Sequence, residues 1–313
     1  MRKPFYHPTL RLADHQRWRQ PRAIVRIVKA APLALTVALV AAAQTPSFDY
    51  DRTKPLDMRV GGAETRGTVR IDDISFASLD GGRTAAYLVT PPGRGKAAGA
   101  LFVHWYDSES PLSNRTQFLN EAVELAQHGL VSLLIATPWS DPQWYPKRDV
   151  ARDFENSIQE VRELRRALDV LAAQPRVDRN RLALVGHDFG AMYGILAAAS
   201  EKRVSAVALQ AFTGSFSDWY LYNQKQLAPD ARQRVIDRLA PLDPLKFLGQ
   251  LGSTPVLLQF AEKDFYVPRD HAEALYAAVR GPKQILWYQA GHGLNDQASQ
   301  DRQKWLRQAL KLK

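Results

Sequence analysis

Five residues, Gly186 to Gly190, contain the side chain best placed for chemistry. They read Gly-His-Asp-Phe-Gly, follow a short apolar run and precede a helical pattern. In a sharp turn from strand to helix, a side chain at either glycine would collide with a neighbouring element, so only the central residue projects into the cleft. The pattern therefore predicts that Asp188 occupies the tip of such a turn. An aspartate that merely caps the following helix is the alternative interpretation.

A carboxylate at this position limits the reactions that the site can perform. If it attacked an ester carbonyl, it would form an anhydride, which is higher in energy than the ester. If it attacks a saturated carbon that bears a leaving group, it forms an alkyl ester, which water can then hydrolyse. Asp188 therefore disfavours ordinary acyl transfer and favours cleavage at a saturated carbon.

The elements that would position this residue are short apolar runs that alternate with helical patterns from residue 69 onward. Several runs are continuously apolar, as parallel strands covered on both faces require. The expected strands are Val69 to Phe76, Thr84 to Thr90, Ala98 to His104, Val131 to Ala136, Arg181 to Val185, Val204 to Gln210, Pro255 to Ala261 and Gln284 to Tyr288. Strands that alternate with helices predict a doubly wound, mostly parallel sheet of eight strands.

One stretch of the chain is similar to a known family. The residues VDRNRLALVGHDFGA, positions 177 to 191, and the preceding helical segment RALDVLAAQP resemble the dienelactone hydrolase and acetyl xylan esterase branch of the α/β-hydrolase superfamily. The resemblance covers residues 70 to 312 and implies an α/β-hydrolase domain over residues 69 to 313. The Gly-His-Asp-x-Gly elbow also resembles that of haloalkane dehalogenases, haloacetate dehalogenases and epoxide hydrolases.

In this family the acid and the histidine follow the nucleophile in chain order, each just after a strand. The resemblance places the acid at Asp264 and the histidine at His292, which completes a triad with Asp188. Flanked by two carboxylates, His292 should be protonated at first. Conversion of Asp188 into an ester removes one charge, lowers the pKa of the imidazole and lets it take a proton from water. Asp264 would fix the tautomer and stabilise the imidazolium.

The same resemblance implies an oxyanion hole made of backbone N–H groups. One donor would be Phe189, directly after the elbow aspartate, and the other Trp105 or Tyr106, after the strand that ends at His104. Relatives with an elbow aspartate usually carry tryptophan where this chain has Phe189, which offers no N–H to a halide. Trp105 stands where many relatives have the glycine of a His-Gly pair.

Residues 211 to 250 interrupt the alternation of strands and helices. An excursion after the carboxyl end of a strand lies above the ligand crevice of such a sheet, so we expect a small lid here. Its aromatic residues Trp219, Tyr220 and Tyr222 are candidates for the substrate pocket, as is the side chain of Trp105. For each of them, a buried structural role is the alternative.

Three hypotheses for the function follow. In the first, the chain hydrolyses an epoxide or a carbon–halogen bond of a small organic substrate through an Asp188 alkyl ester. In the second, Asp188 and His292 activate water for attack on an ester or lactone, a general-base route that needs no anhydride. In the third, the protein has kept the fold and its pocket but only binds a ligand.

The composition excludes several classes of function. The net charge of +10 is concentrated in residues 1 to 43, which hold eight Lys or Arg and one Asp, so the remainder carries only +3 and gives no reason to expect nucleic acid as a partner. The chain has no cysteine, which excludes disulfides, thiolate catalysis and cysteine-based zinc sites. We expect a small-molecule substrate, no metal and no organic cofactor.

The first 43 residues have the pattern of a secretory signal peptide. A basic segment leads into 14 uncharged, mostly apolar residues that end in three alanines, which predicts cleavage after Ala43. The apolar stretch is shorter than the ~20 residues that span a bilayer. We therefore expect a periplasmic or secreted enzyme without a stable membrane span, with residues 44 to 68 as a linker. An uncleaved anchor or a start codon placed too far upstream are the alternatives.

Overall fold

The computed structural model describes residues 46–109 and 114–313. The expected signal peptide lies outside these residues and stays a prediction. The described residues form one nine-stranded sheet in the order β1-β2-β3-β5-β4-β6-β7-β8-β9. Its strands are β1 (Arg59–Arg66), β2 (Val69–Ala77), β3 (Arg83–Thr90), β4 (Ala97–Val103), β5 (Leu130–Ile135), β6 (Val177–His187), β7 (Val204–Gln210), β8 (Val256–Ala261) and β9 (Lys283–Tyr288).

The sheet is antiparallel at one end and parallel over the rest. β1, β2, β3 and β5 pair antiparallel, whereas β5, β4, β6, β7, β8 and β9 all pair parallel. Every residue of β4, β5 and β8 is buried, which explains why these strands are almost entirely apolar in the sequence. The carboxyl ends of the parallel strands lie at one edge of the sheet, where the loops that follow them come together.

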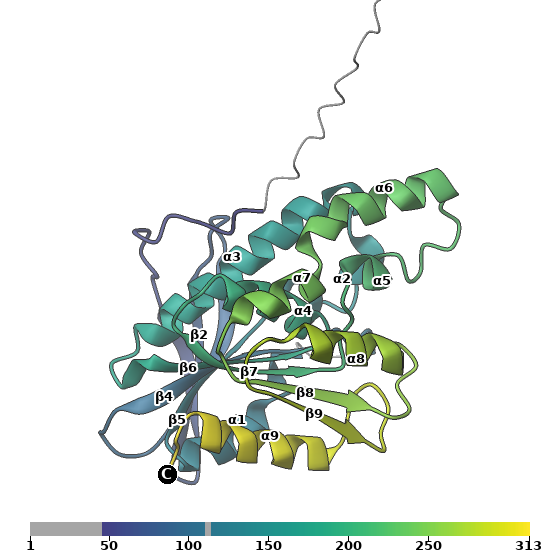
Figure 1. The fold of residues 1–313 in the computed structure, drawn as a ribbon. Helices are drawn as coiled ribbons and strands as arrows, with labels where there is room; N and C mark the ends of the chain where they lie inside the picture. The colour runs from purple at the N-terminus through teal and green to yellow at the C-terminus, as the bar shows by residue number, and fades with distance from the viewer. Residues whose placement is uncertain (1–45, 110–113) are drawn as a thin grey trace, which may run out of the picture. The chain divides into compact units, whose positions relative to one another are not determined.

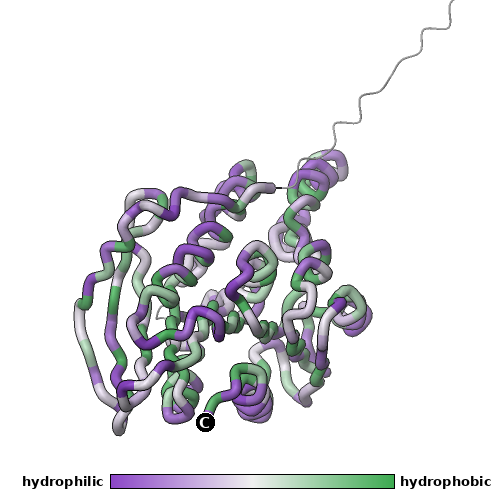
Figure 2. The backbone as a smooth tube through the Cα atoms, turned by 60° about the vertical axis from the view of Figure 1, so that its left-hand side comes forward, coloured by the Kyte–Doolittle hydropathy of each residue, from purple (hydrophilic) through white to green (hydrophobic). Residues whose placement is uncertain are grey.

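Helices cover both faces of the sheet (Figure 1). The helices are α1 (Leu119–Gln127), α2 (Trp144–Lys147), α3 (Asp153–Ala172), α4 (Phe189–Ala199), α5 (Phe216–Tyr220), α6 (Pro229–Leu239), α7 (Pro244–Leu248), α8 (Arg269–Ala278) and α9 (Asp296–Ala309). Apolar residues of α3, α4, α7 and α8 pack in one core cluster, and those of α1 and α9 pack in a second cluster on the other face. Hydrophobic residues gather in the strands and on the inward sides of the helices (Figure 2).

The eight strands expected from the sequence are present as β2 to β9, but the prediction that residues 44 to 68 form a linker was wrong. β1 lies in this segment and extends the sheet to nine strands by pairing with β2. All eight of its residues are exposed, so it has no alternation of apolar and polar residues. Backbone hydrogen bonds hold it in place, and a side-chain pattern could not reveal it.

The segment expected to form a lid, residues 211–250, divides into parts with different surroundings. The start of the segment, at the end of α5, lines the cavity described below. α6 instead packs beside α3, where Arg238 bonds to Glu155, and α7 packs against α4 and α8. None of the helices in the described part of the chain is long and apolar enough to cross a membrane.

A buried ion pair joins the two helices on one face of the sheet. Arg302 on α9 donates from Nε to Glu121 on α1 at 2.9 Å, and its Nη1 donates to the amide oxygen of Gln259 on β8 at 2.8 Å. Gln259 in turn donates to the hydroxyl of Tyr288 on β9 at 2.8 Å. This network ties the two helices to β8 and β9, the strands that precede Asp264 and His292.

We expect Glu121→Gln to destabilise the fold. The substitution leaves the charge of Arg302 buried without its counterion, and breaking a buried pair in this way costs about 3–5 kcal/mol. The measurement is the free energy of unfolding in urea. As a control, Asp230→Asn breaks the exposed pair with Arg234 and should leave the free energy of unfolding nearly unchanged. Equal losses in the two variants would contradict the role given to the buried pair.

Candidate active site

Asp188 occupies a sharp turn between β6 and α4. Its backbone has φ 56° and ψ −120°, a left-handed conformation that is rare for a residue with a side chain. A Cβ on Gly186 would lie 2.5 Å from the carbonyl oxygen of Gly190, and a Cβ on Gly190 would lie 2.6 Å from the carbonyl oxygen of His104. The turn is therefore closed on both sides, and it can form only with glycine at these two positions.

The three side chains expected to form a triad lie together at the carboxyl edge of the sheet. Nδ1 of His292 lies 2.9 Å from Oδ2 of Asp264, and Nε2 lies 4.0 Å from Oδ1 of Asp188. The carboxylate of Asp264 is fully buried and also accepts the backbone N–H groups of Tyr266, at 2.8 Å, and Val267, at 3.2 Å. Asp264 is thus fixed by its own loop and orients the imidazole, whose Nε2 faces Asp188.

Two backbone N–H groups serve the carboxylate of Asp188. That of Tyr106 donates to Oδ2 at 3.1 Å, and that of Phe189 acts on the carboxylate by lowering its pKa. Oδ1 is buried without a hydrogen-bond partner. Of the two alternatives for the second donor, Tyr106 fits and Trp105 does not, because the N–H of Trp105 donates to the side-chain oxygen of Gln117 at 3.0 Å.

The pKa values of Asp188 and His292 depend on burial and on the charges of Asp188, Asp264 and His292. Burial raises the pKa of Asp188 to about 6, although His292 and the two backbone N–H groups act to lower it. Burial acts to lower the pKa of His292, but its hydrogen bond to Asp264 and the charges of Asp188 and Asp264 raise it above its usual value. At pH 7 these directions favour an ionised Asp188 next to a protonated His292.

The side chains of Gln117 and His187 support the site, and no sequence motif indicates this role. The amide nitrogen of Gln117 lies 2.6 Å from Nδ1 of His187, and Nε2 of His187 lies 3.0 Å from the backbone carbonyl oxygen of His292. Burial holds the pKa of His187 well below its usual value, so the ring is neutral. It then donates from Nε2 to the carbonyl and accepts at Nδ1, which fixes its tautomer. The Trp105 ring stacks on His187 at 5.0 Å between centroids.

A cavity of about 390 Å³ opens onto Asp188 and His292. Of the aromatic residues proposed for the pocket, Trp219, Tyr222 and the ring of Trp105 line it. Tyr220 was a wrong prediction: its ring is 1% exposed and its hydroxyl bonds to that of Tyr193 in the core. The further lining residues, which sequence analysis did not single out, are Asp107, Ser108, Glu109, Tyr145, Asn223, Tyr266 and Gly293.

Three features define a hydrolase of the α/β class. They are the mostly parallel sheet covered by helices, the sharp turn between β6 and α4, and the aspartate and histidine in the loops after β8 and β9. Comparison with known proteins agrees. Residues 61–303 match the alpha/beta hydrolase family, and the chain belongs to it. In the described part of the chain, no group of three or more metal-binding side chains is placed to hold a metal ion.

Similar proteins include esterases and a transferase. The fold is similar to that of acetyl xylan esterase 1 from Thermoanaerobacterium sp. JW/SL YS485, with a TM-score of 0.67, 15% identity, and coverage of 82% of this chain and 89% of that one. An acetyl xylan esterase from Paenibacillus sp. R4 gives a TM-score of 0.63, 17% identity, and coverage of 82% and 90%. The polyketide transferase ATR5 of Stachybotrys chlorohalonatus is 27% identical over 189 residues, 59% of each chain.

We expect Gly186→Ala to disrupt the elbow. The added Cβ meets backbone atoms that cannot move aside, so the variant should lose about 3 kcal/mol of stability together with its activity. Thermal unfolding and turnover measure the two effects. Gly62→Ala on β1 is the matched control, because nothing lies within 4 Å of its Cβ and its stability should stay within about 0.5 kcal/mol. A folded, active Gly186→Ala variant would contradict the steric argument.

Proposed function

We propose that this hydrolase cleaves the bond between a saturated carbon and an oxygen or halogen leaving group, with Asp188 as the covalent nucleophile. The hydrogen bond from the Tyr106 N–H to Oδ2 of Asp188 carries the proposal. The oxyanion donors already hold the aspartate carboxylate, so they are aimed at an oxyanion that forms on Asp188 itself. This is what hydrolysis of an Asp188 ester requires.

The same observation argues against the general-base route. In that route the substrate's carbonyl oxygen must occupy the oxyanion hole while Asp188 and His292 activate water. Here the carboxylate of Asp188 takes the N–H group of Tyr106, and the Phe189 N–H also favours its charged form. A substrate carbonyl would have to displace a charged acceptor with a neutral one, which is unfavourable because bonds to ionised acceptors are the stronger.

In the first step, Oδ1 of Asp188 attacks the carbon. A bond forms between Oδ1 and carbon as the bond from carbon to the leaving group breaks, and the leaving group departs with the electron pair. Oδ1 suits this task because it has no hydrogen-bond partner and is not stabilised by a donor. The product is an alkyl ester whose carbonyl oxygen is Oδ2, still held by the Tyr106 N–H.

In the second step, the charge on Asp188 is gone, so the pKa of His292 falls and its Nε2 proton passes to the leaving group or to solvent. The neutral Nε2 can then accept a proton from water. The resulting hydroxide attacks Cγ of Asp188, and the negative charge that develops on Oδ2 is stabilised by the N–H groups of Tyr106 and Phe189. The intermediate collapses, the alkoxide leaves and takes the proton from His292, and Asp188 is again a carboxylate. One water molecule is consumed and one alcohol is released.

Two kinds of donor in the cavity wall are proposed to receive the leaving group. The indole N–H of Trp219 is buried without a hydrogen-bond partner, and its ring centroid lies 5.5 Å from that of His292. The phenol rings of Tyr266 and Tyr222 also line the cavity, and that of Tyr266 lies 5.1 Å from His292. A phenol can protonate the alkoxide of an opened epoxide, whereas an indole N–H can only stabilise it or a halide by hydrogen bonding.

A single turnover in heavy-oxygen water tests the covalent route. The enzyme is given, in excess over substrate, panels of epoxides, haloacids, lactones and short esters, and the Asp188 peptide is then examined by mass spectrometry. We expect one heavy oxygen in Asp188 with an epoxide or a haloacid, because water attacks Cγ and not the substrate carbon. The Asp264 peptide of the same digest is the internal control and should stay unlabelled.

Two results would overturn the proposal. Turnover of a lactone or an ester without label in Asp188 would establish the general-base route instead. The absence of turnover with all four classes would remove the proposed reaction and leave only ligand binding to be explained.

We expect His292→Gln to trap the ester. The first step does not need the imidazole as a base, so the variant should gain the mass of the alkyl group on Asp188 while steady-state turnover falls by roughly 10⁴-fold. In the wild type, alkylation should become faster as the pH rises through about 6, because only ionised Asp188 attacks. In the variant this midpoint should move upward, since the His292 charge that lowers the Asp188 pKa is gone.

The control for this experiment is His271→Gln, which changes an exposed histidine on α8 that lies next to Asp218. It should show normal turnover and no accumulated adduct. A His292→Gln variant that carries no adduct, while the wild type turns over the same substrate, would contradict the two-step scheme.

A further inference from the structure

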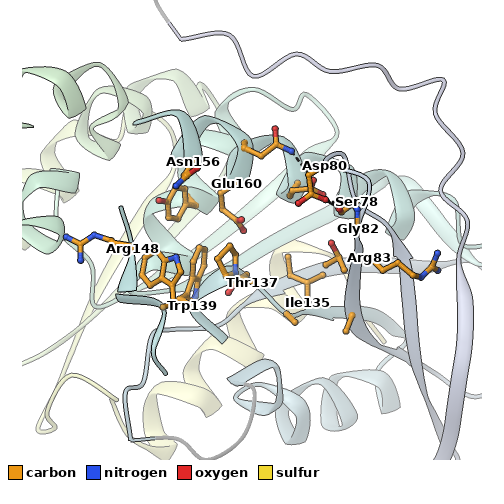
Figure 3. A pocket seen from close by; sticks show the side chains of 18 of the residues that line it. Ser78, Asp80, Gly82, Arg83, Ile135, Thr137, Trp139, Arg148, Asn156 and Glu160 are labelled. Atoms are coloured by element: carbon orange, nitrogen blue, oxygen red, sulfur yellow. Dashed lines mark hydrogen bonds between the residues drawn. The ribbon is translucent and has the colours of Figure 1, made fainter. Parts of the chain in front are cut away.

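A second cavity, of about 510 Å³, lies between the β2–β3 turn, the end of β5 and α3 (Figure 3). It shares no lining residue with the cavity at Asp188. Trp144 and Tyr220 line the second cavity and Phe189 lines the first, with ring centroids 5.2 Å apart for Trp144 and Phe189 and 5.7 Å apart for Phe189 and Tyr220. A wall of packed aromatic rings therefore separates the two cavities.

Glu160 on α3 is the unusual residue of the second cavity. Its side chain is directed from the helix toward Thr137 (Figure 3), yet the residue is only 7% exposed. Within the described residues it has no hydrogen bond and no ion pair. Burial, together with the neighbouring charge of Glu163, raises its pKa to about 8. A buried carboxyl group without a partner costs free energy, and a bound group that pairs with it would remove this cost.

Glu163, one turn along α3, adds a second unpaired acceptor. Its Oε1 accepts the backbone N–H of Leu79 at 2.6 Å and the side-chain amide of Gln159 at 3.1 Å. Its Oε2 is buried without a hydrogen-bond partner. The cavity therefore presents acceptor oxygens from two carboxyl groups of the same helix.

The basic residues of the cavity do not compensate these acids. Arg148 is bonded to Asp153 at 3.3 Å, and the guanidinium of Arg83 bonds to Asp57 and Ser75.

The remaining polar groups of the cavity are satisfied or uncharged. Asp80 is held by its own turn through the hydroxyl of Ser78 and the N–H of Gly82, and the hydroxyl of Tyr193 is bonded to those of Ser157 and Tyr220. Burial raises the pKa of Tyr193 well above its usual value, so the phenol stays neutral. The cavity therefore lacks a positively charged group that pairs with the carboxyl groups of Glu160 and Glu163.

We infer that the second cavity binds a protonated primary amine with an apolar body. The ammonium group has three N–H donors and suits the free oxygens of Glu160 and Glu163. The apolar body would pack on the partly exposed ring of Trp144, whose face also attracts a cation. An organic cation fits better than a metal ion, since no set of metal-binding side chains is assembled in the described residues. The inference does not depend on the proposed reaction at Asp188.

Isothermal titration calorimetry on the full chain tests this inference, with benzylammonium as the probe and benzyl alcohol and benzoate as its neutral and anionic counterparts. We expect saturable binding of benzylammonium alone. Because the carboxyl group of Glu160 is mostly protonated in the empty cavity at pH 7, binding should release a proton, which buffers of different ionisation enthalpy reveal. For the same reason, affinity should increase as the pH rises from 6 to 8.

Three variants locate the binding. Glu160→Gln keeps the shape of the neutral acid and should fold, but it should weaken benzylammonium binding by about 10-fold to 100-fold, because a hydrogen bond to a charged group is lost. Glu124→Gln removes an equal charge from the exposed face of α1 and should leave binding unchanged. Asp188→Asn should also leave binding unchanged, since its cavity is separate.

Several outcomes would overturn the inference. These are equal affinity for benzylammonium and benzyl alcohol, unaltered binding by Glu160→Gln, loss of binding in Asp188→Asn, or no binding of the amine at millimolar concentration.

Discussion

The site depends on the backbone of Asp188, which adopts a positive φ at the point where β6 becomes α4. A residue with a side chain in this conformation costs about 1–3 kcal/mol, so the surroundings must hold it. Its N–H donates to the carbonyl oxygen of Gln210 on β7 at 3.0 Å, and its own carbonyl accepts the N–H groups of Ala191 and Met192, both at 3.0 Å. The turn is thereby anchored to the neighbouring strand and to the following helix, and the carboxylate meets the Tyr106 N–H.

Burial raises the pKa of this carboxylate and also creates its need for hydrogen-bond partners. Removal from water raises its free energy when it is charged, whereas the nearby imidazolium and two backbone N–H groups favour the ionised form. Together, these opposing contributions place the pKa of Asp188 at about 6. His292 experiences the converse balance, because burial disfavours its cation and two carboxylates favour it. Loss of the charge on Asp188 would lower the pKa of His292, which is the response that the proposed two-step reaction requires.

Local patterns predicted the parts of the structure that local physics controls. Eight strands follow from their apolar runs, and Asp188 follows from the spacing of the two glycines around it. What could not be predicted depends on contacts between distant segments. Trp105 is removed from the oxyanion hole because Gln117, twelve residues on, takes its N–H. Tyr220 turns into the core to reach another phenol, and the second cavity is assembled from several distant segments that carry no common motif.

The exposed strand β1 forms one edge of the sheet, and edges with free backbone groups tend to pair with other chains. This strand carries charges at Arg59, Glu64 and Arg66, and its register shifts between Val60 and Gly62. Charged side chains and an irregular backbone oppose the addition of another strand. β1 therefore covers the backbone of β2 while presenting a poor template itself, which protects the sheet against aggregation through this edge.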